Sequence, residues 1–299
     1  MIRRPGKALL ALVCTLACAV ALPAAAGAKV KVGLSDQNTP FFSDPRFLAL
    51  HIHEARLVVP FDVASARSER GQLNATAAWL SAARQAHVTP LISFGDNHNH
   101  GRVPTIHQYV VAVRAFIKRF PQVHQFTAWN EPDFIYLPLS RNPWLAAQYF
   151  NQLAFTCRHC TVLAGDMFMP APQLHSYLRT YVRYLARQPS GWALHDYRDI
   201  RGRSTAQLQA LESLTRGPIW LDETGGIESR GHWQYRNQSA AAAARDEQYL
   251  FSLPRRHRRI AYIFHYQWQS AFGAGWDSGL IDLQGHERPA YKVVAAAAR

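Results

Sequence analysis

Several signals of common protein classes are missing from this sequence. No Gly-rich turn follows the first strand-like run, because Gly33 is followed by Leu-Ser-Asp-Gln-Asn, which cannot cradle a phosphate. No serine stands in a tight Gly elbow, which argues against a serine hydrolase. Aromatic residues are not interleaved with basic ones as on a nucleic-acid-binding surface, so no nucleic-acid partner is expected.

Linkers, repeat arrays and low-complexity tracts are missing too, which favours one domain. After residue 28 no stretch is long and apolar enough to cross a membrane. No second pair of cysteines or histidines stands at ligand spacing, so neither a metal nor another cofactor is expected. Hydrophobic residues make up 48% of the chain and charged ones 18%, which favours a sizeable core over disorder.

The first 28 residues differ from the rest. Three basic residues precede the apolar run Ala8–Leu22, and small residues follow it up to Ala28. This pattern predicts a secretory signal peptide over 1–28 and a mature domain over 29–299 that is secreted or held in the cell envelope. An uncleaved membrane anchor is the alternative, which the shortness of the apolar run disfavours.

The chain is basic, with 33 Lys and Arg against 20 Asp and Glu and a formal net charge of +13. Removal of the three basic residues of the signal peptide lowers this charge to +10. Attraction to an acidic polysaccharide or an anionic cell surface is one explanation. A general bias toward arginine and alanine is the other, and the sequence favours it.

Two of the four cysteines, Cys157 and Cys160, lie in the mature domain at C-x-x-C spacing. In an exported protein this spacing predicts a local disulfide that pins a loop. A zinc site would need two more ligands, and a thioredoxin-like redox pair would begin a helix, whereas this pair follows one.

Strand-like and helix-like segments alternate from Lys29 onward. The expected strands are Val30–Leu34, Ala55–Val59, Val88–Phe94, Val123–Trp129, Thr161–Ala164, Trp192–Leu194, Pro218–Leu221 and Ile260–Tyr266. The expected helices are Arg46–His51, Leu73–Ala86, Ile106–Phe120, Trp144–Phe155, Gln173–Ala186, Thr205–Leu214, Ala240–Leu253 and Ala290–Ala298. Short buried runs without strict alternation indicate a parallel sheet covered by helices.

Eight such units in about 270 residues predict a single-domain (β/α)8 barrel, a TIM barrel. A doubly wound open sheet is the alternative. We expect the mature domain to be a monomer. In a barrel of this kind the active site lies over the C-terminal ends of the strands.

The fourth strand-like run ends in Trp129-Asn130-Glu131-Pro132. Proline cannot donate a ladder hydrogen bond and disfavours helix for the residue before it, so Asn130 and Glu131 are expected where a buried strand leaves its sheet. The other expected strand ends carry Ser35, Asp36, Arg56, Asp96, His98, Asp166, His195, Asp196, Tyr197, Asp222, Glu223, His265 and Trp268.

Two of these side chains, Glu131 and Glu223, come from the fourth and seventh strands, nearly opposite each other across the barrel mouth. A pair of facing carboxyls supports general acid/base work together with a carboxylate nucleophile or base, as in glycosidic bond cleavage. Aromatic residues at the rim suit sugar rings. The sequence therefore predicts an oligo- or polysaccharide substrate.

The motif around Glu131 resembles the strand-four signature of the retaining clan A (β/α)8 glycoside hydrolases. That resemblance implies that Glu131 is the acid/base and that Asn130 contacts the sugar 2-hydroxyl. The segment Leu221-Asp-Glu223-Thr-Gly resembles the strand-seven motif, whose glutamate is the nucleophile.

Further positions extend the resemblance over most of the mature domain. His195 and Tyr197 are similar to the strand-six H-x-Y pair, in which the tyrosine bonds the nucleophile. Arg56 resembles the arginine beside the nucleophile, and Trp268 the tryptophan that floors the −1 sugar site. The end of the third strand, which includes Asp96 and His98, matches no pattern within the clan, and neither do the loops after strands four and seven.

Simpler explanations remain for single residues. His195 with Tyr197 is also consistent with a buried core pair, Arg56 with a structural ion pair, and Trp268 with ordinary core. Asp222 is an alternative nucleophile, although alternation along a strand turns it away from the face of Glu223.

Together these features predict a secreted retaining glycoside hydrolase acting by double displacement, with its carboxyls about 5–5.5 Å apart. A barrel that binds carbohydrate without cleaving it, and a transglycosylase using the same residues, are the alternatives.

Overall fold

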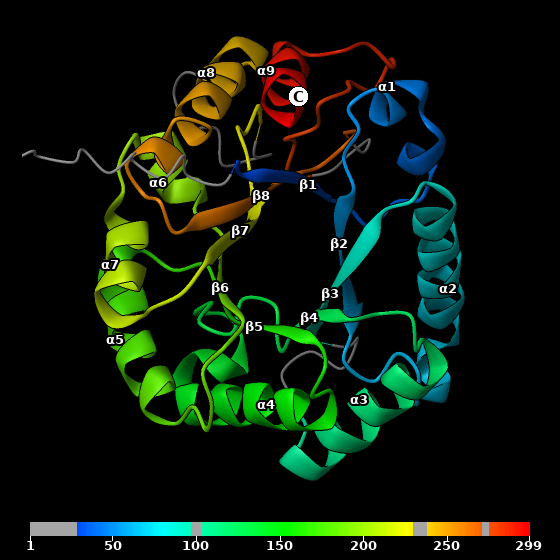
Figure 1. Ribbon diagram of the computed structural model, residues 1–299, viewed down its shortest axis with the longest axis vertical. Helices are drawn as coiled ribbons and strands as arrows, with labels where there is room; N and C mark the ends of the chain where they lie inside the picture. Colours follow the sequence, from blue (N-terminus) through cyan, green and yellow to red (C-terminus); the bar gives the residue numbers. More distant parts are fainter. Residues whose placement is uncertain (1–28, 97–102, 230–237, 271–274) are drawn as a thin grey trace, which may run out of the picture.

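The computed structural model describes residues 29–96, 103–229, 238–270 and 275–299, so the expected signal peptide lies outside the described residues. Eight parallel strands close into a barrel in the order β1-β2-β3-β4-β5-β6-β7-β8. Helices form a ring around it (Figure 1). The predicted (β/α)8 fold is confirmed. The open sheet is excluded because the first strand pairs with both the second and the last.

All eight expected strands form, although one is shorter than expected. The strands are β1 (Lys31–Ser35), β2 (Glu54–Pro60), β3 (Thr89–Gly95), β4 (Gln125–Thr127), β5 (Thr161–Met167), β6 (Gly191–Leu194), β7 (Ile219–Thr224) and β8 (Ile260–Tyr266). β4 ends before Trp129 because the chain turns there toward Pro132. The carbonyl of Ala128 accepts a hydrogen bond from the hydroxyl of Tyr109, at 2.7 Å, instead of a ladder bond.

The helices match the expected apolar periodicity, with one addition. The α-helices are α1 (Pro45–Leu48), α2 (Arg70–Gln85), α3 (Ile106–Arg119), α4 (Pro143–Thr156), α5 (Ala171–Arg183), α6 (Tyr197–Gly202), α7 (Ala206–Leu214), α8 (Ala240–Leu250) and α9 (Pro289–Ala298). Short 3-10 helices are η1 (Pro40–Ser43), η2 (Arg67–Glu69), η3 (Pro138–Arg141) and η4 (Leu253–Arg255). α6 was not expected, because six residues are too few to show a helical period.

Apolar side chains fill the barrel interior in a layer separate from the core under the helices. The members of this layer are Leu91, Leu163, Ala193, Trp220 and Phe264, with Tyr262 packed against them. Alternate residues of a strand share a face. The residues two positions further along therefore also point inward, nearer the C-terminal mouth: Ser93, His195, Asp222 and Tyr266. The apolar layer is thus the floor under a polar site.

Cys157 and Cys160 form a disulfide, as predicted from their spacing. The bridge lies between the end of α4 and the start of β5, at the end of the barrel opposite the polar residues. Within the described ranges, none of the helices is both long enough and apolar enough to cross a membrane.

Candidate active site

Glu131 lies just past the end of β4, at a sharp turn of the chain. Its backbone has a φ of 47°, a conformation that non-glycine residues rarely adopt and that often marks a functional position. The turn is held at its N-terminal side by Asn130, whose N–H donates to the carbonyl of Phe94 at 2.6 Å. The N–H of Glu131 donates to the carbonyl of Asp166 at 3.1 Å. The Glu131 side chain is 19% exposed and therefore open to a substrate.

Glu223 comes from β7 and receives two hydrogen bonds. Arg56 Nη1 donates to its Oε2 at 2.7 Å, and the Tyr197 hydroxyl donates to its Oε1 at 3.2 Å. Its side chain is 15% exposed. Each carboxylate oxygen of Glu223 therefore has a hydrogen-bond donor that fixes its position.

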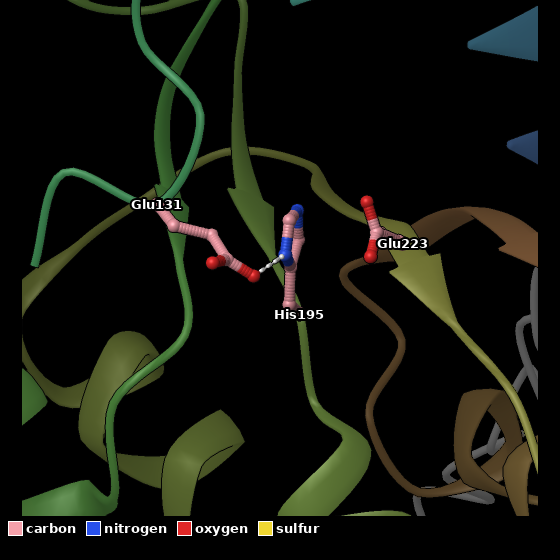
Figure 2. A group of neighbouring side chains, drawn as sticks. All are labelled: Glu131, His195 and Glu223. Carbon is pink, nitrogen blue, oxygen red and sulfur yellow. Dashed lines mark hydrogen bonds and ion pairs between the residues drawn. The ribbon is translucent and has the colours of Figure 1, made fainter. Parts of the chain in front are cut away.

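His195 stands at the end of β6 between the two glutamates, as Figure 2 shows. Its Nδ1 lies 3.0 Å from Oε1 of Glu131. One carboxylate oxygen of Glu131, one of Glu223 and one ring nitrogen of His195 all lie within 4.8 Å of one another, so the two carboxyl groups approach closely.

The imidazole of His195 is fully buried and carries a positive charge. Burial alone would lower its pKa, but Glu223, Asp166 and Glu131 outweigh that effect and raise the pKa well above its usual value. Both ring nitrogens therefore donate, Nδ1 to Glu131 and Nε2 to Oδ1 of Asp166 at 3.1 Å. His195 thereby holds the Glu131 carboxyl toward the mouth.

Arg56 lies at the centre of the buried network under the site. Besides Glu223, its guanidinium contacts Oδ1 of Asn130 at 2.7 Å, Oδ1 of Asp166 at 3.1 Å and Oδ2 of Asp222 at 3.1 Å. Burial lowers the pKa of the Arg56 guanidinium, but the carboxyl groups of Asp166, Asp222 and Glu223 raise it by more than burial lowers it. Arg56 therefore stays charged.

The two buried aspartates under Arg56 differ in protonation. Burial tends to raise the pKa of Asp166, but Arg56 and hydrogen bonds outweigh it and hold the pKa well below its usual range. The hydroxyls of Ser93 and Thr127 also donate to Oδ2 of Asp166. Burial, together with the neighbouring charge of Asp166, raises the pKa of Asp222 well above its usual range. Asp222 is therefore protonated and fully buried, which makes it unsuitable as a nucleophile.

Trp268 differs from the place that the resemblance implies. Its ring is only 3% exposed and packs against Phe47 and Tyr291. A ring covered in this way cannot floor a sugar site. The aromatic residue that β8 directs toward Glu223 is Tyr266, and burial together with the charge of Glu223 raises the pKa of its hydroxyl. Alternation from Phe264 would have identified Tyr266, since both face the interior.

Other strand-end residues have structural partners. Asp36 accepts from the backbone N–H of Trp268 at 2.8 Å, and His265 forms a buried pair with Glu247 at 2.8 Å. His98 lies outside the described residues. Sequence reasoning missed Asp133, whose carboxylate accepts the N–H groups of Phe168 and Met169 and so ties the turn after β4 to the end of β5. No motif signals that contact.

Two residue groups have the spacing of a metal site, Glu131 with His195 and Glu223, and Asp166 with His195 and Asp222. The guanidinium of Arg56 touches Asp166, Asp222 and Glu223, so a positive charge already lies against carboxyl groups of both sets. The network therefore fits a set of charged hydrogen bonds and not a metal centre.

No protein-family model matches this sequence, and no curated protein matches it. Solved structures of glycoside hydrolases share its eight-stranded parallel barrel. A family 5 enzyme, GH5_18 from Streptomyces cattleya in complex with GlcNAc, aligns with a TM-score of 0.61 at 15% identity, over 91% of this chain and 80% of its own. The intracellular xylanase TsXylA of Thermoanaerobacterium saccharolyticum aligns at 0.63 and 12% identity, over 89% and 95%.

A family 39 glycoside hydrolase from Bacteroides cellulosilyticus aligns with a TM-score of 0.59 at 16% identity over 90% of this chain. The chain spans 63% of the length of that enzyme. At these identities the likeness shows the barrel fold, and the chemistry has to be argued from the site itself.

Proposed function

We propose that this protein is a secreted retaining glycoside hydrolase that cleaves O-glycosidic bonds in an oligo- or polysaccharide. The observation that carries the proposal is the pair of partly exposed glutamates from β4 and β7, with one oxygen of each within 4.8 Å. Retaining glycosidases hold their carboxyls about 5–5.5 Å apart, whereas inverting enzymes separate them by about 6.5–9.5 Å to admit water. The glycoside hydrolases that share this barrel add support.

The reaction proceeds in two displacements. Ionised Glu223, held by Arg56 and Tyr197, attacks the anomeric carbon while protonated Glu131 gives its proton to the leaving oxygen. The glycosyl–enzyme ester is then attacked by water, from which Glu131 takes a proton. Product leaves with its original anomeric configuration, and both glutamates return to their starting states.

The roles of the two glutamates can be separated by azide rescue. In a Glu223→Ala enzyme, azide attacks the substrate directly, so the glycosyl azide has the inverted configuration. In a Glu131→Ala enzyme, azide attacks the glycosyl–enzyme, so the azide product retains the configuration. The same product from both variants, or full activity in either, would refute the assignment.

The two alternative functions predict other results. A non-catalytic carbohydrate-binding barrel would bind glycans without hydrolysis, although retention of both glutamates gives no support to a degenerate site. A transglycosylase would give longer oligosaccharides as main products at low substrate concentration.

Export is part of the proposal and rests on the pattern of residues 1–28. Mass spectrometry of the protein from the culture medium and the cell envelope should find a mature N-terminus at Lys29. Recovery of the protein only from the cytoplasm with Met1 intact would contradict this part.

A further inference from the structure

Two adjoining pockets open beside the catalytic pair, over α6 and the start of α8. The first has a volume of about 270 Å³ and is lined by Phe168, Tyr197, Arg198, Arg201, Ile227 and Trp276, with Gly202 at its edge. The second has a volume of about 260 Å³, and its lining includes Arg201, Arg203, Arg245 and Asp246. Arg201 and Ile227 belong to both linings, so the two pockets adjoin each other.

The first pocket lies directly against the catalytic centre. Tyr197 forms part of its wall, and the hydroxyl of the same residue donates to Glu223 at 3.2 Å. A sugar bound there and a sugar at Glu223 would therefore both lie against Tyr197. The pocket volume approaches the lower end of the roughly 300–1,000 Å³ of small-molecule sites, which suits one sugar unit.

Aromatic rings form one side of this pocket. The ring of Trp276 meets that of Tyr197 edge-on, with centroids 4.8 Å apart. Phe168 also belongs to the lining, but it is buried and the guanidinium of Arg198 lies over its ring at 5.6 Å, so Trp276 is the ring available to a ligand. Rings of this kind offer a flat apolar surface to the C–H face of a pyranose.

Positive charge dominates the second pocket. Three arginines, Arg201, Arg203 and Arg245, line it together with one acidic residue, Asp246. Arg203 contacts Asp246 at 3.5 Å, which partly neutralises that pair. Asp246 also interacts with Arg201. The lining therefore carries three guanidinium groups and one carboxylate over a concave surface, and guanidinium groups bind carboxylate or sulfate oxygens in a bidentate manner.

From this arrangement we infer that the protein selects acidic glycans. A sugar packs on Trp276, and its carboxylate or sulfate, or that of the next unit, binds the arginines around Arg201 and Arg245. The inference rests on the proposed function for the position of the sugar at Glu223, but the binding itself needs no cleavage. It also gives a local role to part of the excess positive charge that the sequence alone leaves to general arginine bias.

The test compares matched glycans on an enzyme that cannot turn over. A Glu223→Gln variant is titrated by calorimetry with uronate-containing oligosaccharides and the same molecules after carboxyl reduction, and with sulfated oligosaccharides and their desulfated forms. We expect one acidic set to bind at least ten-fold more tightly than its neutral twin, with an advantage that shrinks as salt is added. The set that shows the advantage identifies the anion.

Arginine variants test whether the tighter binding of acidic glycans depends on the arginine-lined pocket. Arg245→Gln and Arg201→Gln, each in the Glu223→Gln background, should reduce the preference for the acidic glycan by about ten-fold, and Arg201→Lys should lose less. The matched control is Arg114→Gln, because Arg114 is an exposed arginine on α3, on another side of the barrel (Figure 1). Melting temperatures of all variants check that folding is intact.

Three results would overturn the inference: equal affinity for acidic and neutral twins, no binding of any acidic glycan, or an equal loss in Arg114→Gln. The proposed function fails separately. If the parent enzyme hydrolysed neutral glycans as fast as acidic ones, acidic selection would be refuted and the hydrolase function would stand. If the parent enzyme bound acidic glycans tightly but cleaved none, the hydrolase function would be refuted and acidic selection would stand.

Discussion

Asp166 and Asp222 contact two nitrogens of the same guanidinium, and their protonation states are opposite. Asp166 contacts Nη2 of Arg56 at 3.1 Å, and Asp222 contacts its Nε at 3.1 Å. Asp166 is ionised and Asp222 carries a proton, because burial and mutual repulsion prevent two adjacent charges. The pair therefore supplies a single negative charge beneath Glu131 and Glu223.

Amide substitutions at these two positions should have opposite results. Asp166→Asn removes the charge that His195 and Arg56 face, so the free energy of unfolding at pH 7 should fall by about 3–5 kcal/mol. Asp222→Asn imitates the protonated acid and should stay within about 1 kcal/mol of the parent. Urea unfolding measures both. A larger loss in Asp222→Asn than in Asp166→Asn would reverse the assigned protonation.

Stability should depend on pH through Asp196, which accepts a hydrogen bond from Thr224 at 2.5 Å. Burial raises the pKa of Asp196 from 3.8 to about 7. Between about pH 4 and 7 the folded state keeps a proton that the unfolded state has lost, so this residue makes the protein less stable as pH rises through that window. Above pH 7 its effect is constant.

An Asp196→Asn variant should remove that contribution. Its free energy of unfolding should fall less between pH 4 and 7 than that of the parent, by up to about 4 kcal/mol for a shift of about three pKa units. Unfolding curves at pH 4, 5.5, 7 and 8 give the slopes. Parallel pH profiles for parent and variant would show that Asp196 titrates normally.

Loss of the Tyr197 hydroxyl should slow the reaction without unfolding the protein. Tyr197→Phe keeps the ring that packs on Trp276 but removes a donor to ionised Glu223. A hydrogen bond to a charged group contributes about 1.5–3 kcal/mol, which corresponds to roughly a 10–100-fold drop in kcat. Steady-state kinetics with a melting curve separate this effect from misfolding. An unchanged kcat would remove Tyr197 from the machinery.

The leaving group should decide how much Glu131 matters. Without its acid, Glu131→Gln should cleave natural glycans about 10²–10⁴-fold more slowly. An aryl glycoside with a good leaving group needs no protonation in the first step, so formation of the glycosyl–enzyme should change little, and a burst of phenol should precede slow turnover. Equal losses on both substrates would contradict the role of Glu131 as the acid.

Reduction of the Cys157–Cys160 disulfide should affect stability more than catalysis. The bridge closes a very short loop, with a sequence separation of 3, so its entropic contribution is about 2 kcal/mol. It lies at the end of the barrel opposite Glu131. A Cys157→Ala/Cys160→Ala variant should therefore unfold at lower urea concentration with kcat/KM unchanged. A large loss of activity at full folding would point to a redox role.

The fold could be predicted because its pattern is repeated eight times. Each strand is a short apolar run with a helix of period 3.6 after it, and no single error in a boundary changes the count. The parts of the secondary structure that the sequence did not predict are short: the end of β4 and the helix α6. β4 stops at Thr127 because Tyr109 takes the next carbonyl, a tertiary contact that local sequence does not contain.

The site could be predicted where a motif fixed both residue type and strand. Glu131, Glu223, Arg56, His195 and Tyr197 come together as their strand positions required. Trp268 did not follow, since the chain after β8 carries its ring into the core beside Phe47, while Tyr266 keeps the inward face. The partners of His195 and Arg56 also depend on Asp166, whose direction no alternation rule predicts.

The side chain of Asp166 points into the barrel because β5 is irregular between Gly165 and Met167, where its register with β6 shifts. Regular alternation from the inward-facing Leu163 would turn Asp166 toward the helices. Gly165 permits the shift, because its φ is 107° and a Cβ there would lie 2.6 Å from the carbonyl oxygen of Ala193. One additional residue in β5 thus adds an anion to the barrel interior. In this fold the charge balance beneath Glu131 and Glu223 can change through one inserted strand residue, with both glutamates left in place.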